Sequence, residues 1–529
     1  MSFEIRERDI LGRIGRLKTK SGIVETPVLL PVVNPAIQPI PPEKIRREFG
    51  FEALITNAYI LKQRFKDQPI QEGLHKFLNF NGAIMTDSGA YQILVYGDIQ
   101  TNPKEIVQYQ EQIDTDIATI LDIPTGWKVT EKHAAQTVKE TLNRARGFFK
   151  TKTRDDILWV GPVQGGKYLD LVAKSAQETG RLPFNIHALG SPTEVMERYR
   201  FDVLVDMIMT AKMNLPFDRP LHLFGAGHPF MFSLAVALGC DLFDSAAYAL
   251  YARDNRYMTE NGTHRLNELE YFPCACPKCG GTTPKQLLEL KQEQRISFLA
   301  EHNLYVCTAE MKRVKQAIKD GRLWEHLEMR AHAHPALLQA LRTLSKYEEY
   351  IEKHSPTIKN SGLFFFNSIS LMRPEVAHYR KTLTQRYSKP KQAEMLLLMA
   401  QTDTKPFHKS KEYKKVASAL RLREEKDRIH TCFYAAPFGV IPIELDEVYP
   451  LSQYEAVLQL DKETIEYVAH QIADYIDRTD YRTVILINDP KTWKKTVADT
   501  CRKTCRGKKI NFKTFDIEKA LSAETLDLG

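Results

Sequence analysis

Three cysteines near the middle of the chain are spaced so that they could bind one metal ion. Cys274, Cys276 and Cys279 lie in the segment CACPKCGG, residues 274–281. Pro277 and the glycine pair that ends the segment would let the backbone turn around an ion. Thiolates at this spacing are typical ligands of tetrahedral zinc, which needs a fourth group. The candidates for that group are His264, His302, Cys307 and His326.

His302 is the fourth ligand that we predict. It lies in segment 295–318, whose apolar residues recur at helical spacing, so a helix could carry its imidazole back to the thiol loop. Four protein ligands leave no coordination position open, so the predicted Zn²⁺, one per chain, is structural and unsuited to a zinc hydrolase. The alternative is three unconnected thiols on a loop. Cys501 and Cys505, spaced i, i+4 in a basic stretch, are interpreted as incidental.

Carboxylates and an amide at the ends of short apolar runs form a second candidate site. Asp87, Asp122, Gln164 and Asp244 each close such a run. One carboxylate can attack the anomeric carbon of a sugar while another exchanges a proton with the leaving group, if the two lie about 5 Å apart. A further carboxylate, Asp122, suits the paired N–H donors of guanine. For each single aspartate the alternative is a helix N-cap.

Two kinds of residue beside these carboxylates would help to bind a planar ligand. Tyr91 could stack on a flat base, although an ordinary core or rim aromatic is the alternative. Glycines at the same ends would let backbone amides approach a ligand closely. They are Gly165, Gly166, Gly225 and Gly227.

The apolar runs themselves predict the fold. Eight of them, each followed by a helical pattern, precede the cysteines. Continuous apolar runs are typical of buried parallel strands, so we predict a (β/α)8 TIM barrel whose run ends line the catalytic mouth. A doubly wound open sheet is the alternative. We expect segment 192–212 to be one crossover helix, and the runs are residues 27–33, 53–58, 83–89, 117–125, 158–166, 184–190, 221–227 and 241–246.

Composition narrows the functional class. The chain has 529 residues, 43% of them hydrophobic, which predicts two or three globular domains. The charged first residues and the short apolar runs predict a cytoplasmic protein without a membrane span. The net charge of +8 is uneven, with nine basic residues and one acid, Asp499, between Lys491 and Lys513. This local basic face suits a nucleic-acid partner, and a solvated helix surface is the alternative.

Seven motifs in order resemble the tRNA-guanine transglycosylases, specifically the archaeal branch that makes archaeosine. The resemblance covers the N-terminal two-thirds of the chain. It rests on MTDSGAYQ (85–92), LDIPT (121–125), VQGG (163–166), HALGSP (187–192), FGAGHP (224–229), FDSAAYALYAR (243–253) and the cysteine motif with its downstream histidine.

This resemblance implies a role for each matching residue. Asp244 would be the nucleophile that takes the ribose C1′ and releases guanine, and Asp87 the general acid and base. The base would be bound by Ser88, Tyr91, Asp122, Gln164, Gly165, Ala188 and Leu189. The substrates would be tRNA, guanine 15 of its D-arm, and the incoming 7-cyano-7-deazaguanine (preQ0), with no redox cofactor. A queuine-type transglycosylase and a non-catalytic RNA-binding relative are the alternatives.

The resemblance also gives a domain plan. We predict a catalytic domain over residues 1–350 that includes a zinc subdomain at about 268–310, an accessory domain over 351–430, and a second accessory α/β domain with the basic face over 431–529. The family often ends in an RNA-binding PUA domain, for which we find no counterpart. A separately encoded PUA-type protein is therefore our hypothesis, and the family implies a homodimer near the zinc subdomain.

Overall fold

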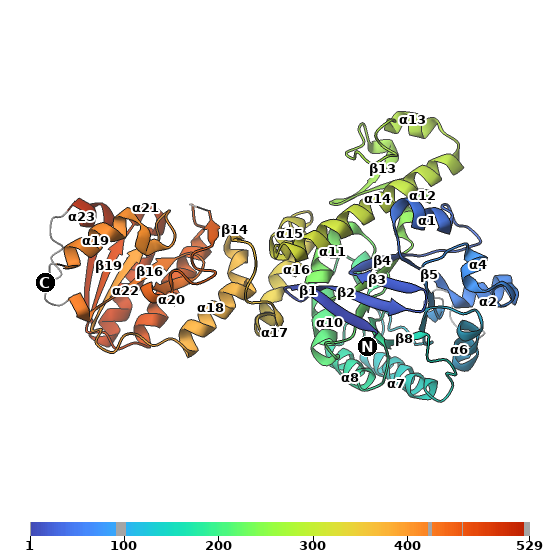
Figure 1. Cartoon of the computed structure of the whole chain (residues 1–529), viewed down its shortest axis with the longest axis horizontal. Helices are drawn as coiled ribbons and strands as arrows, with labels where there is room; N and C mark the ends of the chain where they lie inside the picture. The colour runs from blue at the N-terminus through green and yellow to red at the C-terminus, as the bar shows by residue number, and fades with distance from the viewer. Residues whose placement is uncertain (1, 91–101, 422–425, 458, 523–529) are drawn as a thin grey trace. The chain divides into compact units, whose positions relative to one another are not determined.

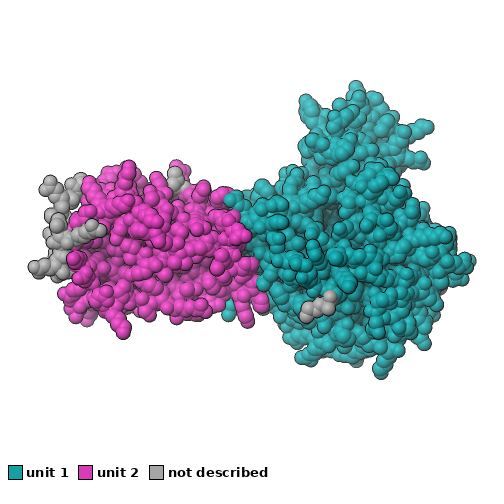
Figure 2. Space-filling model, viewed as in Figure 1, with its two compact units in different colours: residues 1–350 teal, residues 351–529 magenta. Residues whose placement is uncertain are grey.

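The computed structural model describes residues 2–90, 102–421, 426–457 and 459–522. These residues form two compact units, one over residues 1–350 and one over residues 351–529 (Figure 2). Tyr91, which we expect to stack on a base, lies outside the described residues.

Eight parallel strands form a nearly closed barrel in the first unit (Figure 1). A parallel bridge between Val32 and Ile55 joins the first strand to the last in the sheet order. The predicted TIM barrel is confirmed, and the open doubly wound sheet is excluded. In sheet order the strands are β4 (Val28–Pro31), β11 (Leu242–Ser245), β10 (Leu221–Leu223), β9 (Ile186–Leu189), β8 (Leu158–Val163), β7 (Ile117–Thr119), β6 (Ala83–Asp87) and β5 (Ala53–Asn57).

Helices connect consecutive strands and cover the outside of the barrel. Segment 192–212, predicted as one helix, is two helices, because the chain breaks at Tyr199, whose φ of 55° is left-handed. The helices are α1 (Pro42–Phe49), α2 (Ala58–Phe65), α3 (Gln68–Glu72), α4 (Leu74–Leu78), α6 (Pro103–Gln112), α7 (Glu131–Phe148), α8 (Leu169–Gly180), α9 (Thr193–Glu197), α10 (Phe201–Asn214) and α11 (Phe232–Ala237).

A three-stranded antiparallel sheet closes the amino-terminal end of the barrel. It consists of β1 (Phe3–Asp9), β2 (Gly12–Thr19) and β3 (Gly22–Thr26), and its apolar face packs on the barrel interior. Arg13 Nε and Nη2 donate to the two carboxylate oxygens of Asp241, at 2.7 and 2.8 Å, just before β11 begins. Losing one partner of such a buried pair costs about 3–5 kcal/mol. The sheet covers only this end, so a ligand-binding site can form at the opposite, carboxyl-terminal end of the barrel.

Alternation along each strand decides which side chains enter the barrel. The apolar interior takes every second residue, for example Ala83 and Met85 from β6, Val160 from β8 and Leu242 from β11. The same alternation carries the next residues of these strands inward at the carboxyl-terminal rim. Those residues are Asp87, Gln164 and Asp244.

A helical extension with a small hairpin follows the last barrel strand. The hairpin is β12 (Arg256–Thr259) with β13 (Gly262–Arg265), and the cysteine motif lies in the loop before α13 (Pro284–Glu289). The helix predicted around His302 is confirmed as α14 (Gln292–Lys319). The remaining helices are α12 (Ala247–Arg253), α15 (Leu323–Ala331), α16 (Pro335–Thr343) and α17 (Glu348–His354).

One five-stranded sheet organises the second unit. Its order is β17-β16-β15-β19-β20, parallel except for β17. The sheet takes strands from both predicted accessory segments, since β15 precedes residue 430 and β19 follows it. The strands are β15 (Met395–Ala400), β16 (Ile429–Ala435), β17 (Gly439–Pro442), β19 (Thr483–Asn488) and β20 (Asn511–Asp516), with a separate parallel pair β14 (Leu363–Phe365) and β18 (Tyr454–Ala456).

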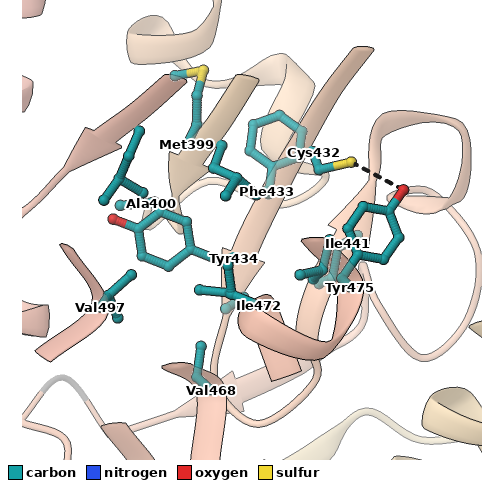
Figure 3. Packing of buried hydrophobic residues seen from close by; sticks show 14 of the residues in the cluster. Met399, Ala400, Cys432, Phe433, Tyr434, Ile441, Val468, Ile472, Tyr475 and Val497 are labelled. Atoms are coloured by element: carbon teal, nitrogen blue, oxygen red, sulfur yellow. Dashed lines mark hydrogen bonds between the residues drawn. The ribbon is translucent and has the colours of Figure 1, made fainter. Parts of the chain in front are cut away.

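Helices pack on this sheet around an apolar core. Figure 3 shows Tyr434 of β16 near Ile472 of α20 and Val497 of α22, all of them buried. Burying a side chain of this size contributes about 1.5–3 kcal/mol, so the core can hold the second unit together. The helices are α18 (Pro374–Gln385), α19 (Lys411–Arg421), α20 (Lys462–Asp477), α21 (Pro490–Trp493), α22 (Thr496–Lys508) and α23 (Ile517–Ser522).

Helix α22 separates its thiols from its charges. Cys501 and Cys505 are fully buried in the core of the second unit, whereas Lys503 and Arg506 are exposed. The two cysteines therefore serve packing within that core.

Across the described ranges, none of the helices is long and apolar enough to cross a membrane.

Candidate functional site

Asp87 ends β6 and is held by a residue from the neighbouring strand. Asn57 lies opposite it in the register of β5 and β6, and its Nδ2 donates to Asp87 Oδ2 at 2.8 Å. Asn57 Oδ1 in turn accepts from the backbone N–H of Ile60 at 2.9 Å, at the start of α2. Both ends of the amide are thus fixed. We did not select Asn57 from the sequence, although the last inward position of β5 is the signal that would have found it.

The surroundings of Asp87 favour its protonated form. Burial, followed by the negative charges of Asp122 and Asp244, raises the pKa of Asp87 to about 7, against the opposing backbone N–H groups of Gly89 and Ser88. A carboxyl group with this pKa is present in both protonation states near neutral pH. It can therefore give up a proton or accept one.

Asp122 and Gln164 form a buried carboxylate–amide pair. Gln164 Nε2 donates to Asp122 Oδ2 at 2.5 Å. Gln164 Oε1 accepts from the backbone N–H of Thr125 at 3.0 Å and from the hydroxyl of Ser191 at 2.9 Å, which fixes the orientation of the amide. A side chain at Gly190 would place its Cβ 2.1 Å from Gln164 Nε2, so glycine is required there. Burial raises the pKa of Asp122 to about 6, and the bond from Gln164 opposes the rise.

Asp244, in β11, has two differently bonded oxygens. Its Oδ1 accepts from His222 Nε2 at 2.9 Å and from the backbone N–H of Gly225 at 3.0 Å. Its Oδ2 accepts no hydrogen bond from any residue that the structure describes. Gly225 has a φ of 67°, where a Cβ would also meet Thr193 Oγ1 at 2.6 Å. The glycine therefore lets the loop after β10 aim an amide at Asp244.

The other predicted site residues divide between side chains and backbone. Ser88 is fully buried, and within the described ranges its hydroxyl has no hydrogen-bond partner, so it is available to a ligand. Gly165 has a φ of 144°, and a Cβ there would lie 2.6 Å from Val172 N. Ala188 and Leu189 are fully buried in β9, and Ala188 packs in the barrel interior.

This rim combines groups in different chemical states. Asp244 offers a free carboxylate oxygen, Asp87 can exchange a proton near neutral pH, and Asp122 with Gln164 presents fixed polar groups. A nucleophile beside a proton donor can displace a leaving group that needs protonation. The arrangement therefore suits transfer of a group between two acceptors.

Away from this rim, the three cysteines and His302 form one compact group. Their ligand atoms all lie within 4.8 Å of one another. Cys276 Sγ is 3.6 Å from Cys279 Sγ, and His302 Nδ1 lies 3.6 and 3.3 Å from the same two sulfurs. A tetrahedral ion with metal–sulfur bonds of about 2.3 Å would separate its sulfurs by about 3.8 Å, so the group fits a metal ion.

Residues around this group orient the histidine. His302 is fully buried, and its Nε2 lies 2.8 Å from the carbonyl oxygen of Met258, so a proton there leaves the Nδ1 lone pair toward the sulfurs. The ring of Tyr257 stacks on the imidazole, and the two ring centroids are 3.6 Å apart. The other candidates lie elsewhere: His264 is exposed, the Cys307 thiol donates to Gly227 O, and His326 bonds Glu310.

The raised pKa of Asp87 predicts a pH-dependent effect on stability. In the unfolded chain its carboxyl ionises near the ordinary value of 3.8, and in the folded protein near 7, so the folded state loses stability as pH rises through this window. Asp87→Asn removes the ionisation. We expect it to raise Tm relative to the unsubstituted protein, and by more at about pH 8 than at about pH 5.

The control for this measurement is Asp155→Asn, because the Asp155 side chain is 92% exposed. Its effect on Tm should be small and equal at the two pH values. A gain from Asp87→Asn that is no larger at the higher pH would contradict the raised pKa.

Comparisons with known proteins agree with this arrangement. Residues 9–336 match the family model described as queuine tRNA-ribosyltransferase, and residues 376–527 match a domain of unknown function, DUF5591. A protein of Saccharolobus solfataricus named tRNA-guanine(15) transglycosylase is 44% identical over 92% of this chain and 97% of its own length. Proteins of the same name from Pyrobaculum aerophilum and Methanocaldococcus jannaschii are 44% and 42% identical, over 86% and 90% of this chain and 90% and 72% of their own lengths. The chain therefore belongs to the queuine tRNA-ribosyltransferase family.

Proposed function

We propose that this protein is a glycosyltransferase that replaces guanine 15 of tRNA with preQ0. The observation that carries the proposal is the rim itself, where Asp244 has a free oxygen and Asp87 has a pKa of about 7. Family membership and the names of the relatives support the same reaction. In this proposal the enzyme exchanges one base for another and needs no oxidant or reductant.

Each half of the exchange uses the two aspartates in turn. Asp244 Oδ2 attacks C1′ of the ribose while the bond from C1′ to guanine breaks, and the electron pair leaves with the base. Protonated Asp87 gives its proton to the departing guanine. In the second half, Asp87 takes a proton from preQ0, whose ring nitrogen attacks C1′ and releases Asp244. Asp87 thus returns to its starting state.

The buried polar groups of the rim would recognise the base. Guanine and preQ0 present the same N1 and exocyclic amine donors, so a single carboxylate, Asp122, can read both. Gln164 keeps that carboxylate in place, and the free hydroxyl of Ser88 offers one more hydrogen bond. The backbone at Gly165, Ala188 and Leu189 would close the pocket, and Tyr91 would stack on the base.

Removing the nucleophile is the direct test of this reaction. Asp244→Asn keeps an oxygen for His222 and Gly225 but removes the carboxylate, so exchange of labelled guanine into a tRNA transcript should fall by more than about 1,000-fold with little change in Tm. Asp254→Asn is the matched control, since Asp254 is 60% exposed and pairs only with Arg256 among the described residues. Near-normal exchange by Asp244→Asn would reject the proposed mechanism and favour a non-catalytic RNA-binding role.

The incoming base separates our proposal from a queuine-type enzyme. The matched family model carries the queuine name, whereas the relatives carry the guanine-15 name. We expect the purified chain to incorporate preQ0 at position 15. Incorporation of queuine in its place would favour the alternative.

We also propose that the group of three cysteines and His302 holds a structural Zn²⁺. Its four side chains fill a tetrahedral coordination sphere, which leaves no position for water or substrate. The ion would tie the loop of residues 274–281 to α14. Because such a site does not exist in the unfolded chain, metal binding would add to folding stability.

Metal content tests this assignment. Cys276→Ser should lower zinc from about one ion per chain and should lower Tm, because a ligand of a structural ion is lost. Cys307→Ser is the matched control, since Cys307 lies on α14 beyond His302 but outside the metal-binding group. Full zinc occupancy in His302→Ala would show that the fourth ligand is wrong.

The tRNA partner gives the basic face of α22 a role in this proposal. Lys495, Lys503 and Arg506 are exposed and form no ion pair with any residue that the structure describes. Their spacing of i, i+8 and i+11 places them along one side of the helix. Phosphate contacts supply much of the affinity for nucleic acid, and unpaired cations are suited to make them.

Salt dependence tests this contact. The triple alanine variant of Lys495, Lys503 and Arg506 should bind tRNA more weakly, and the slope of log Kd against log salt should fall by about 2–3. The matched control replaces Lys411, Lys414 and Lys415, which lie on α19 and change the charge equally. Equal effects of the two triple variants would show only a non-specific charge effect.

Two further partners belong to this proposal. A separately encoded PUA-type protein would add phosphate contacts and hold tRNA near the rim. A homodimer remains an expectation from the family.

A further inference from the structure

His222 lies inside the barrel directly next to Asp244. It is the middle residue of β10, where it pairs with Ala188 of β9 and Leu242 of β11. Both of these neighbours pack in the barrel interior, so His222 faces inward as well. The histidine is fully buried and cannot contact bulk water. Its Nε2 lies 2.9 Å from Asp244 Oδ1.

The contact with Asp244 shows which nitrogen of the imidazole carries a proton. A carboxylate oxygen accepts hydrogen bonds and cannot donate one, so the proton of this contact is on Nε2. Within the described ranges, His222 Nδ1 is buried and has no hydrogen-bond partner. The bond to Asp244 is therefore the one hydrogen bond that the ring makes among the described residues.

We propose that His222 is a positioning residue for Asp244, an inference that rests on the proposed role of Asp244 as nucleophile. His222 and the Gly225 amide together hold Oδ1, which leaves Oδ2 as the oxygen that bonds to C1′. His222 lies on the interior side of the carboxylate, so it neither contacts the sugar nor transfers a proton.

The same hydrogen bond also affects the covalent intermediate. When Oδ2 bonds to C1′, the carboxylate becomes an ester, and Oδ1 becomes a weaker acceptor. A donor at Oδ1 therefore stabilises the free carboxylate more than the ester. Without His222, the equilibrium between free enzyme with tRNA and covalent intermediate with released guanine shifts toward the intermediate, while misplacement of Oδ2 slows exchange.

Variants of similar shape separate the hydrogen bond from packing. His222→Gln places an N–H donor near the position of Nε2, whereas His222→Met has a similar shape without a donor, and His222→Phe is a second variant without one. His187→Met is the matched control. His187 lies in β9 at a buried position, but the alternation with Ile186 and Ala188 turns its ring away from the barrel interior.

The experiment measures exchange of labelled guanine and, separately, the fraction of enzyme trapped as covalent tRNA adduct at fixed guanine. We expect His222→Met and His222→Phe to lower kcat by about 10- to 100-fold, with KM for tRNA within about 2-fold, and to raise the adduct fraction. His222→Gln should restore most of kcat, and His187→Met should leave kcat unchanged. If only one of the two variants without a donor folds, that variant alone is sufficient for the test.

Two outcomes would overturn the inference. A folded His222→Met or His222→Phe with normal kcat would show that the hydrogen bond is not needed. His222→Gln as impaired as the apolar variants, with an unchanged adduct fraction, would show that the ring matters only for packing. Either result leaves the proposed function intact if Asp244→Asn is inactive, whereas an active Asp244→Asn would reject the proposed function itself.

Discussion

Three carboxyl groups share one buried rim of the barrel, and their burial, together with the charges of two of them on Asp87, sets the chemistry of the site. Asp87 is buried near the negative charges of Asp122 and Asp244, and these effects together raise its pKa to about 7. Each of the three has its own donors: Asn57 for Asp87, Gln164 for Asp122, and His222 with Gly225 for Asp244. The donors fix the geometry, and burial with the two negative charges favours the protonated form of Asp87. Similar residues can thus take different roles.

The barrel provides this arrangement through strand alternation and a closed amino-terminal end. Interior positions near the centre are apolar, and the same alternation brings polar residues inward at the carboxyl-terminal rim. The sheet of β1 to β3 covers the opposite end, where the buried pair of Arg13 and Asp241 anchors it. Burial of these carboxyl groups opposes folding, so the apolar interior and this anchor must outweigh that cost.

The sequence was sufficient to predict the barrel and most of the residues of the candidate site for a physical reason. Buried parallel strands need continuous apolar runs, and polar residues that end them must lie at one rim, which is how Asp87, Asp122, Gln164 and Asp244 were found. The group of three cysteines and His302 was predictable because thiols at short spacing have few uses other than metal binding. Its fourth member, His302, followed from the helical pattern around it.

Other features depend on contacts that the sequence does not display. Strands β1 to β3 carry charged residues on their outer face. The role of their apolar residues becomes clear only from their contacts with the barrel interior. Asn57 and His222 matter because of the strand register, which pairs residues far apart in the chain. The break at Tyr199 also escaped prediction, because segment 192–212 has a continuous helical pattern.

In the proposed reaction, Asp87 supplies the proton that guanine needs in order to leave. The most direct test is the single-turnover rate of guanine release from tRNA, measured from about pH 5.5 to pH 9 at constant ionic strength. If protonated Asp87 is the donor, the rate should fall as pH rises through about 7, where its carboxyl ionises. A rate that stays constant between about pH 6 and pH 9 would contradict this account.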